Sequence, residues 1–430
     1  MLKFGKSLLC LAAICICPTA PRAAAVVDTP YTVGTWQGFR PAALSMTFDD
    51  GLPNQYTTLL NLLNQYGYKA TYFVDMGNRK RFNIPWDDIR KAAASGHEIA
   101  SHTVTHPHLG DLSVTEQEKE LKDCKDTLER EIPTQKVLTM AYPFCSAGND
   151  AAVAKYYLAA RKCDKRFEPA DPANFMGLSS FSWSNDVAAS SLNSNVESAI
   201  SKKAWTTYLI HGIDAGGYTP VKSSMLKEHF DFLRTKENQI WIATFADVAR
   251  YIRERQTLTL KQVRSTKDSL VLKATITLPN TPYNVPLSFQ RPLPDGWNTC
   301  FASQNGRALK DSLLTVNSKR MIMFDAIPDG SDIVLSSSGV VALHSAPGGI
   351  AGKVALSNAQ GKLRFSLPAG LAGKLELSLY DYQGGRRAVV TAMHADDGYH
   401  VDLPKIGSGV YGAKLSLNGV LFGESFRLRL

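Results

Sequence analysis

The sequence predicts an α/β unit followed by β-rich modules, and two observations lead to this prediction. Between residues 38 and 255, short apolar runs that end in polar residues alternate with segments whose apolar side chains recur at helical spacing. Such alternation is typical of a parallel sheet or barrel covered by helices. Beyond residue 256, runs in which apolar and polar side chains alternate indicate antiparallel strands. We expect these strands to form two modules, over residues 256–342 and 343–430.

The elements of the α/β unit follow from apolar runs and from residues that start or stop helices. The first strand is expected over residues 42–48, after a short lead over residues 26–40, and Gly51 marks the turn that ends it. Further strands are predicted over residues 70–74, 97–101, 137–142, 207–211 and 239–244. Helices are predicted between Pro53 and Gly67, over residues 86–94, after the capping box that starts at Ser113, and over residues 223–234 and 245–255.

Asp49 and Asp50 follow the first strand directly. Side chains alternate between the two faces of a strand, so these carboxylates would point apart unless the turn bends them together. Two carboxylates at one strand end repel each other and lose hydration unless a cation or a proton lies between them. An ordinary turn with an aspartate hydrogen bond is the simpler alternative.

His102 and His106 follow the strand over residues 97–101 and are four positions apart, which is one helical turn. Two imidazoles and one carboxylate suit zinc, and also cobalt or nickel, because ligand type does not decide among these metals. Three protein ligands leave a position open for water and substrate, as in a catalytic metal site. A histidine-rich surface loop is the alternative.

Thr-Phe-Asp-Asp-Gly at residues 47–51 and His-Thr-Val-Thr-His at residues 102–106 resemble the first two motifs of the NodB-homology polysaccharide deacetylases, carbohydrate esterase family 4. The resemblance implies a distorted (β/α)7 barrel. It also implies that Asp49 is the catalytic base and that Asp50, His102 and His106 hold a divalent metal. The implied reaction removes N- or O-linked acetyl groups from a glycan such as chitin, peptidoglycan or acetylxylan and releases acetate.

Two further positions match the family's motifs, and a third departs from them. His211 ends a strand where the family has its general acid, and Phe144 stands where a backbone N–H stabilises the oxyanion. The arginine that orients the base in the family is replaced by Ala141. Either another cation, such as Arg161 or Lys162, takes over its role, or the base is tuned differently.

The remaining candidate residues rest on looser matches to the family. Tyr142 and Trp183 are expected beside the substrate, although Trp183 could equally be part of the core. Asp186 and Asp214 are the two candidates for the residue that orients the acid histidine. The alternative function is a catalytically impaired barrel that binds carbohydrate, and a third is a structural surface protein in which the β modules matter most.

The N-terminus has the pattern of a secretory signal peptide over residues 1–25, with Lys3 and Lys6 before an apolar run and small residues at the cleavage site. We therefore expect a secreted or cell-surface protein. Removal of this segment takes away three basic residues, so the net charge falls from +9 to about +6. No apolar run reaches the eighteen residues of a membrane span, and no dense basic run favours nucleic acid. Weak attraction to acidic glycans is compatible with this charge.

Four cysteines, Cys124, Cys145, Cys163 and Cys300, lie beyond the predicted signal peptide. Export permits a disulfide, and either Cys145–Cys163 or Cys124–Cys163 is compatible with the sequence.

The C-terminal module is predicted to be a β-sandwich, because short strands recur at even spacing. Gly-Val-Tyr at residues 409–411 and Asn-Gly at 418–419 loosely resemble the sorting domains of type IX secretion substrates, which would imply attachment to the cell surface. An accessory module that binds glycan or only spaces the enzyme is the alternative.

Overall fold

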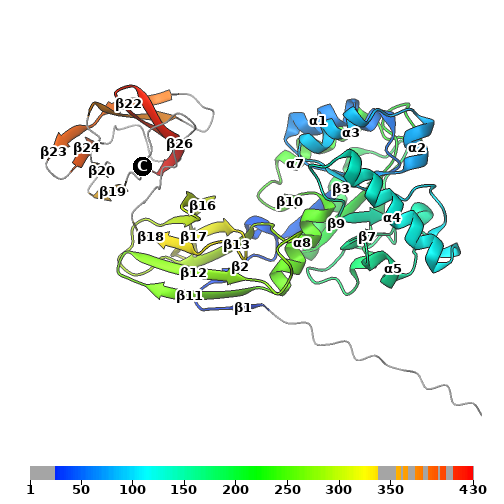
Figure 1. Ribbon diagram of the computed structural model, residues 1–430, viewed down its shortest axis with the longest axis horizontal. Helices are drawn as coiled ribbons and strands as arrows, with labels where there is room; N and C mark the ends of the chain where they lie inside the picture. The colour runs from blue at the N-terminus through cyan, green and yellow to red at the C-terminus, as the bar shows by residue number, and fades with distance from the viewer. Residues whose placement is uncertain are drawn as a thin grey trace, which may run out of the picture.

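The computed structural model shows an α/β unit and several antiparallel sheets (Figure 1). It describes residues 25–337 and the segments 355–359, 362–366, 373–380, 386–395, 398–402 and 410–429. The predicted signal peptide lies outside these residues, apart from Ala25.

A parallel sheet of eight strands forms the centre of the α/β unit. Its strands are β3 (Ala42–Phe48), β4 (Thr71–Val74), β5 (Glu98–Ser101), β6 (Thr139–Ala141), β7 (Ala159–Arg161), β8 (Phe181–Ser182), β9 (Trp205–Ile210) and β10 (Ile240–Ile242). The order is β7-β6-β5-β4-β3-β9-β8, and β10 pairs with the first half of β3. A parallel bridge between Arg161 and Leu178 connects β7 to the segment before β8, so the strands curl into a distorted barrel. The predicted fold class is confirmed.

Eight helices accompany these strands in the described part of the chain. They are α1 (Thr58–Tyr66), α2 (Met76–Arg81), α3 (Trp86–Ala94), α4 (Val114–Glu131), α5 (Asp150–Ala154), α6 (Ala189–Lys202), α7 (Ser223–Arg234) and α8 (Phe245–Gln256). The predicted helices correspond to α1, α3, α4, α7 and α8, and the capping box of Ser113 and Glu116 starts α4 as expected. The helices α2, α5 and α6 and the strands β7 and β8 were not predicted.

Burial explains why β3 is the central strand. All seven of its residues are buried, because neighbouring strands flank it on both edges and helices cover the sheet. Continuous burial on both faces requires an apolar or internally bonded side chain at each position, and Thr47 meets this requirement by donating its hydroxyl hydrogen to the carbonyl of Tyr208 at 2.5 Å. The first polar residues after this strand are therefore fixed in space by a rigid element.

Two antiparallel sheets follow the barrel in sequence. One contains β11 (Thr259–Ser265), β12 (Ser269–Thr275), β18 (Ile333–Ser336), β14 (Phe301–Gln304) and β15 (Arg307–Ala308), and the other contains β16 (Asp311–Val316), β17 (Lys319–Ala326) and β13 (Leu287–Pro292). Both sheets contribute to one core, in which the rings of Phe289 and Phe324 lie 5.6 Å apart. The prediction of β structure beyond residue 256 is confirmed.

The first described residues belong to these sheets, although the sequence suggested only a short lead into the barrel. β1 (Val26–Val27) pairs in parallel with β11, and β2 (Thr32–Val33) pairs with β13. The helix α8 adds contacts from the barrel side, since the hydroxyl of Tyr251 donates to the carbonyl of Gly34 at 2.8 Å. The described chain therefore begins in the β module, passes through the barrel, and then returns to the same β module.

The last part of the described chain forms two further four-stranded sheets. One contains β19 (Ala355–Ala359), β20 (Lys362–Ser366), β24 (Gly398–Asp402) and β23 (Met393–Ala395). The other contains β22 (Arg386–Thr391), β21 (Leu375–Tyr380), β25 (Val410–Leu417) and β26 (Val420–Arg429). All pairs within them are antiparallel, as predicted from the alternating sequence.

Candidate active site

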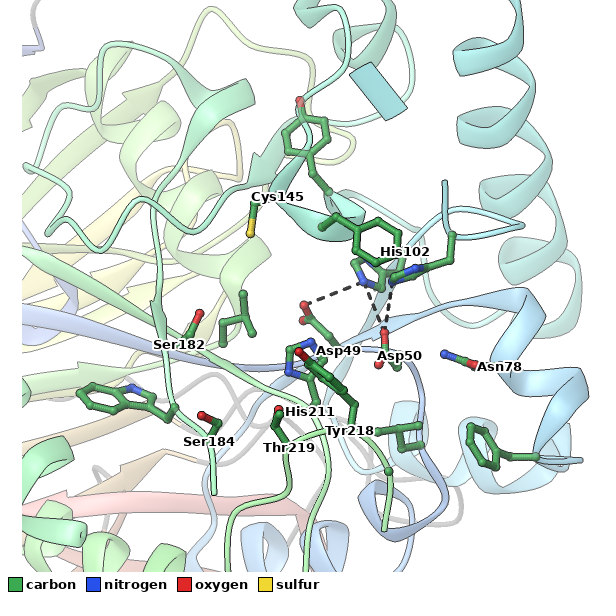
Figure 2. A pocket seen from close by; sticks show the side chains of 18 of the residues that line it. Asp49, Asp50, Asn78, His102, Cys145, Ser182, Ser184, His211, Tyr218 and Thr219 are labelled. Carbon is green, nitrogen blue, oxygen red and sulfur yellow. Dashed lines mark ion pairs between the residues drawn. The ribbon is translucent and has the colours of Figure 1, made fainter. Parts of the chain in front are cut away.

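A cavity of about 910 Å³ lies at the carboxyl ends of the barrel strands. Most of the candidate residues named from the sequence line it: Asp49, Asp50, His102, His106, Tyr142, Phe144, Trp183 and His211. Figure 2 shows Asp49, Asp50 and His102 facing one another, with His211 close to Asp49. Sites of parallel α/β folds form at this end of the sheet, because the loops after the strands converge there.

The turn after β3 brings the two adjacent carboxylates to the same cavity. Asp50 has a φ of +73° and Gly51 a φ of +63°, so two successive left-handed residues reverse the alternation of a strand. A positive φ is costly for a residue with a Cβ and persists where the surroundings hold it. The side-chain amide of Gln55 supplies part of this support by donating to the carbonyls of Asp49 at 2.6 Å and His211 at 2.9 Å.

Asp50, His102 and His106 form a cluster with the donor set of a metal site. Their ligand atoms lie within 4.8 Å of one another, and Asp50 Oδ1 is 3.6 Å from His102 Nε2 and 3.4 Å from His106 Nε2. Asp50 Oδ1 is buried and accepts no hydrogen bond from the described residues. His102 Nδ1 is 2.8 Å from the carbonyl of Ala141, which can only accept, so the Nε2 lone pair faces the cluster. These residues fit a divalent metal.

The charge states in this cluster follow from burial and from the neighbouring groups. Burial lowers the pKa of His102 more than the nearby carboxylates raise it, which favours the neutral imidazole that a metal needs. For His106, burial acts to lower the pKa, but the contact with Asp50 and the surrounding carboxylates outweigh it and raise the pKa. Burial likewise acts to raise the pKa of Asp50, but the three histidines around it lower that pKa overall.

The two histidines do not lie on a helix, although their spacing is that of a helical turn. Residues 102–106 form an irregular loop in which Thr103 and His106 have φ values of +69° and +58°. The N–H of His106 donates to Thr103 Oγ1 at 3.1 Å and closes the loop. This tight loop, rather than a helical face, turns both imidazoles toward Asp50.

Arg161, one of the two cations considered as replacements for the missing arginine at residue 141, lies beside Asp49. Its guanidinium forms an ion pair with Asp49 Oδ2, and the side chains of both residues are almost fully buried. Arg161 also donates to Ser180 Oγ at 3.1 Å, and its guanidinium carbon lies 5.2 Å from the ring centre of Phe73. Lys162, the other candidate, lies 4.0 Å from Asp164 instead. Asp49 Oδ1 is buried and accepts no hydrogen bond from the described residues, so it remains available to a ligand.

The loop after β6 lines the cavity beside His106, whose ring centre lies 4.6 Å from that of Phe144. Phe144 and Cys145 have φ values of +54° and +59°, and the Phe144 ring stacks on His108 at a centroid distance of 4.2 Å. Within the described contacts, the N–H of Phe144 has no acceptor. The hydroxyl of Tyr142 donates to the carbonyl of Met176 at 2.9 Å, so it supports the loop rather than reaching into the cavity.

A disulfide joins Cys145 to Cys163, which is one of the two pairings that the sequence allowed. It connects the loop that carries Phe144 to the end of the strand that carries Arg161. Cys124 is free and buried, and burial raises the pKa of its thiol to about 12.

His211 and Trp183 form another wall of the cavity. The ring of His211 meets Tyr218 edge-on at 5.1 Å, and Trp183 packs edge-on against Tyr208 at 5.7 Å. The two candidates for orienting His211 do not reach it in any described contact. Asp186 pairs with Lys222 at 2.8 Å, and Asp214 accepts the N–H of Ser223 at 2.8 Å.

Sequence reasoning missed the wall formed by α2, which contributes Asn78 and Arg81 together with the following Phe82. The helix is short and lacks an apolar stripe, so periodicity could not reveal it. Its start did have a signal, because Asp75 directly follows the predicted strand and caps the helix through the N–H groups of Gly77 and Asn78.

Part of the chain around this site is similar to known polysaccharide deacetylases. Residues 38–160 match the model of the polysaccharide deacetylase family, a segment that includes the acidic pair and both histidines. This part of the chain therefore carries the family's sequence signature. The loose resemblance of the C-terminal module to sorting domains is not confirmed by these comparisons.

Two curated relatives illustrate the similarity. A gellan lyase from a Bacillus species is 28% identical over 350 residues, which cover 76% of this chain but 14% of the lyase. A chitin deacetylase from Colletotrichum lindemuthianum is 28% identical over 156 residues, which cover 35% of this chain and 62% of the deacetylase. The chain thus spans less than two thirds of the length of either relative.

One solved structure that the chain is similar to is the Xyl-CE4 domain of a multidomain xylanase from the hindgut metagenome of Trinervitermes trinervoides. It is 17% identical, covers 48% of this chain and 89% of that domain, and has a TM-score of 0.34.

None of the helices in the described residues is long and apolar enough to cross a membrane.

The Arg161–Asp49 ion pair predicts a specific pattern of stabilities. Arg161→Met would leave the Asp49 carboxylate buried without its partner, and we expect the free energy of unfolding to fall by about 3–5 kcal/mol. Adding Asp49→Asn should recover much of this loss, because the orphaned charge is removed with it. Urea denaturation of both single variants and the double variant measures the coupling. Purely additive losses would contradict the pairing.

The disulfide predicts a redox-dependent stability. It closes a loop of 18 positions, so opening it should lower the free energy of unfolding by about 3 kcal/mol. We expect a dithiol reductant to lower the melting temperature of the natural protein. The double variant Cys145→Ser, Cys163→Ser should melt at that lower temperature with or without the reductant. A reductant effect that persists in the double variant would assign it to another bond.

Proposed function

We propose that the barrel is a secreted, metal-dependent deacetylase that hydrolyses N- or O-linked acetyl groups of a glycan and releases acetate. The observation that carries this proposal is that two adjacent carboxylates have different partners. Asp49 is paired with a guanidinium and keeps one oxygen available, while Asp50 faces two imidazoles. One carboxylate is thus arranged as a base and the other as a ligand.

Asp50, His102 and His106 would hold the metal, with zinc as the first candidate and cobalt or nickel as alternatives. A divalent metal bound there would polarise the acetyl carbonyl and lower the pKa of bound water toward ~7. The hydrogen bond from His102 to the Ala141 carbonyl fixes the ring with Nε2 toward the cluster.

In the proposed reaction, Asp49 Oδ1 accepts the proton of the attacking water as general base. Arg161 balances the charge of Asp49 and fixes its orientation, which replaces the arginine that the family carries at the position of Ala141. The N–H of Phe144 stabilises the oxyanion of the tetrahedral intermediate. His211 gives a proton to the departing amine or alcohol, so that acetate and the deacetylated sugar are released.

The shape of the cavity supports a carbohydrate substrate. Its volume of about 910 Å³ is at the upper end of the range for small-molecule sites, which agrees with more than one sugar ring. The aromatic side chains of Phe82, Phe144, Trp183 and Tyr218 are spaced around its wall, where they offer flat surfaces for sugar rings. Acetylated xylan, chitin oligomers and peptidoglycan are the substrates to compare.

Acetate release by the protein without residues 1–25 tests the proposal. We expect release from one member of this panel in the presence of zinc, and its loss in the presence of a chelator. Recovery of activity after zinc is added back would show that the chelator acts on the metal. A folded, zinc-loaded protein that releases no acetate from any member would instead favour a carbohydrate-binding protein.

Substitution of the base separates catalysis from binding. Asp49→Asn should lower the rate of acetate release by about 10²–10⁴-fold, because general-base assistance is lost while the three metal ligands remain. A matched control is Asp123→Asn on the surface of α4, whose only described partner is Lys119. Zinc content should be unchanged in both variants. Full activity of Asp49→Asn would exclude Asp49 as the base.

A further inference from the structure

The loop that carries the two histidines is attached to the helix α4 through one side chain, Glu120. Its Oε2 accepts the N–H groups of Val104 at 2.8 Å and Thr105 at 3.0 Å. Its Oε1 accepts the hydroxyl of Thr105 at 2.7 Å. The carboxylate therefore binds two of the three residues that lie between His102 and His106.

This loop needs an external support because its backbone is strained. Thr103 has a φ of +69°, which is a genuine outlier for a β-branched residue, and His106 has a φ of +58°. Strained residues of this kind persist only when the surrounding structure holds them. Within the loop, the hydrogen bond from the His106 N–H to Thr103 Oγ1 is the main closing contact.

The helix that carries Glu120 is a rigid base for this support. Leu121, Cys124 and Leu128 on its inner face are completely buried in the barrel core. The other acidic side chains of α4 serve the helix surface: Glu116 belongs to the capping box, and Glu118, Asp123, Asp126, Glu129 and Glu131 pair with basic side chains. Glu120 forms no salt bridge within the described part of the chain, and its hydrogen bonds go to the loop.

We propose that Glu120 is a positioning residue for the metal centre, which rests on the metal-binding part of the proposed function. By fixing the peptide groups between the two histidines, it keeps both imidazoles turned toward Asp50 before the metal arrives. A ligand loop that is already ordered loses less conformational freedom on binding, and partners of this kind commonly contribute 10–100-fold to metal affinity.

Zinc affinity, measured by competition with a chromogenic chelator, tests this inference without any substrate. We expect Glu120→Ala to weaken zinc binding by about 10–100-fold. Glu120→Gln should recover part of the affinity, because its carbonyl oxygen still accepts backbone N–H groups and its amide can donate to the Thr105 hydroxyl. Thr105→Ala, which removes one of the three hydrogen bonds, should have a smaller effect and serves if Glu120→Ala does not fold.

Glu118→Ala is the matched control, because Glu118 lies on the same helix and pairs with Lys155 on the surface. It should leave the zinc affinity unchanged. The melting temperature of the zinc-free variants distinguishes positioning from general stability. The inference is overturned if Glu120→Ala binds zinc as tightly as Glu118→Ala, or if Glu120→Gln and Thr105→Ala lose affinity only in proportion to a lower melting temperature.

The result is separable from the test of the enzymatic proposal. A natural protein that binds zinc but releases no acetate would contradict the deacetylase function and leave the role of Glu120 open to the same affinity measurement. A natural protein that binds no zinc would overturn this inference directly.

Discussion

Two buried carboxylates at the end of one strand impose the main constraint on this molecule. Asp49 and Asp50 are adjacent, and only 2% and 7% of their surfaces are exposed. Mutual repulsion and lost hydration would together disfavour this arrangement in the absence of compensating charge. The two carboxylates have different partners. A guanidinium from β7 pairs with Asp49, and two imidazoles from a loop after β5 lie beside Asp50. The left-handed turn at Asp50 is what allows both solutions at once.

The sequence revealed the residues of the site better than the means by which they are held. The acidic pair and both histidines follow apolar strands, so their convergence could be expected from the fold. The two histidines are spaced by one helical turn, but a loop with two left-handed residues, and not a helix, brings them together. Arg161 was only one of two candidate cations, since β7 has three residues and no readable periodicity. Strands β6, β5 and β4 separate β7 from β3 in the sheet, so the pairing of Arg161 with Asp49 depends on the curl of the barrel.

The elements that escaped prediction share a dependence on distant parts of the chain. The helix α6 is rich in serine and asparagine, which are weak helix formers, and its buried Leu192 and Val196 show that packing stabilises it. The strands β1 and β2 have two residues each and exist only through their partners. Asp186 was matched to the site by its closeness to Trp183 in sequence, but its side chain pairs with Lys222 on the surface.

The pairing of β1 and β2 with strands beyond the barrel has a consequence for how the chain is made. Tyr31, for example, donates to Gln262, which lies 231 positions further along. The barrel is therefore an insertion within the β module, and both of its connections leave on the same side. During synthesis the barrel can fold while the module still waits for its later strands, since contacts of such long range form slowly. The folded barrel can thus provide a surface against which the following sheets assemble.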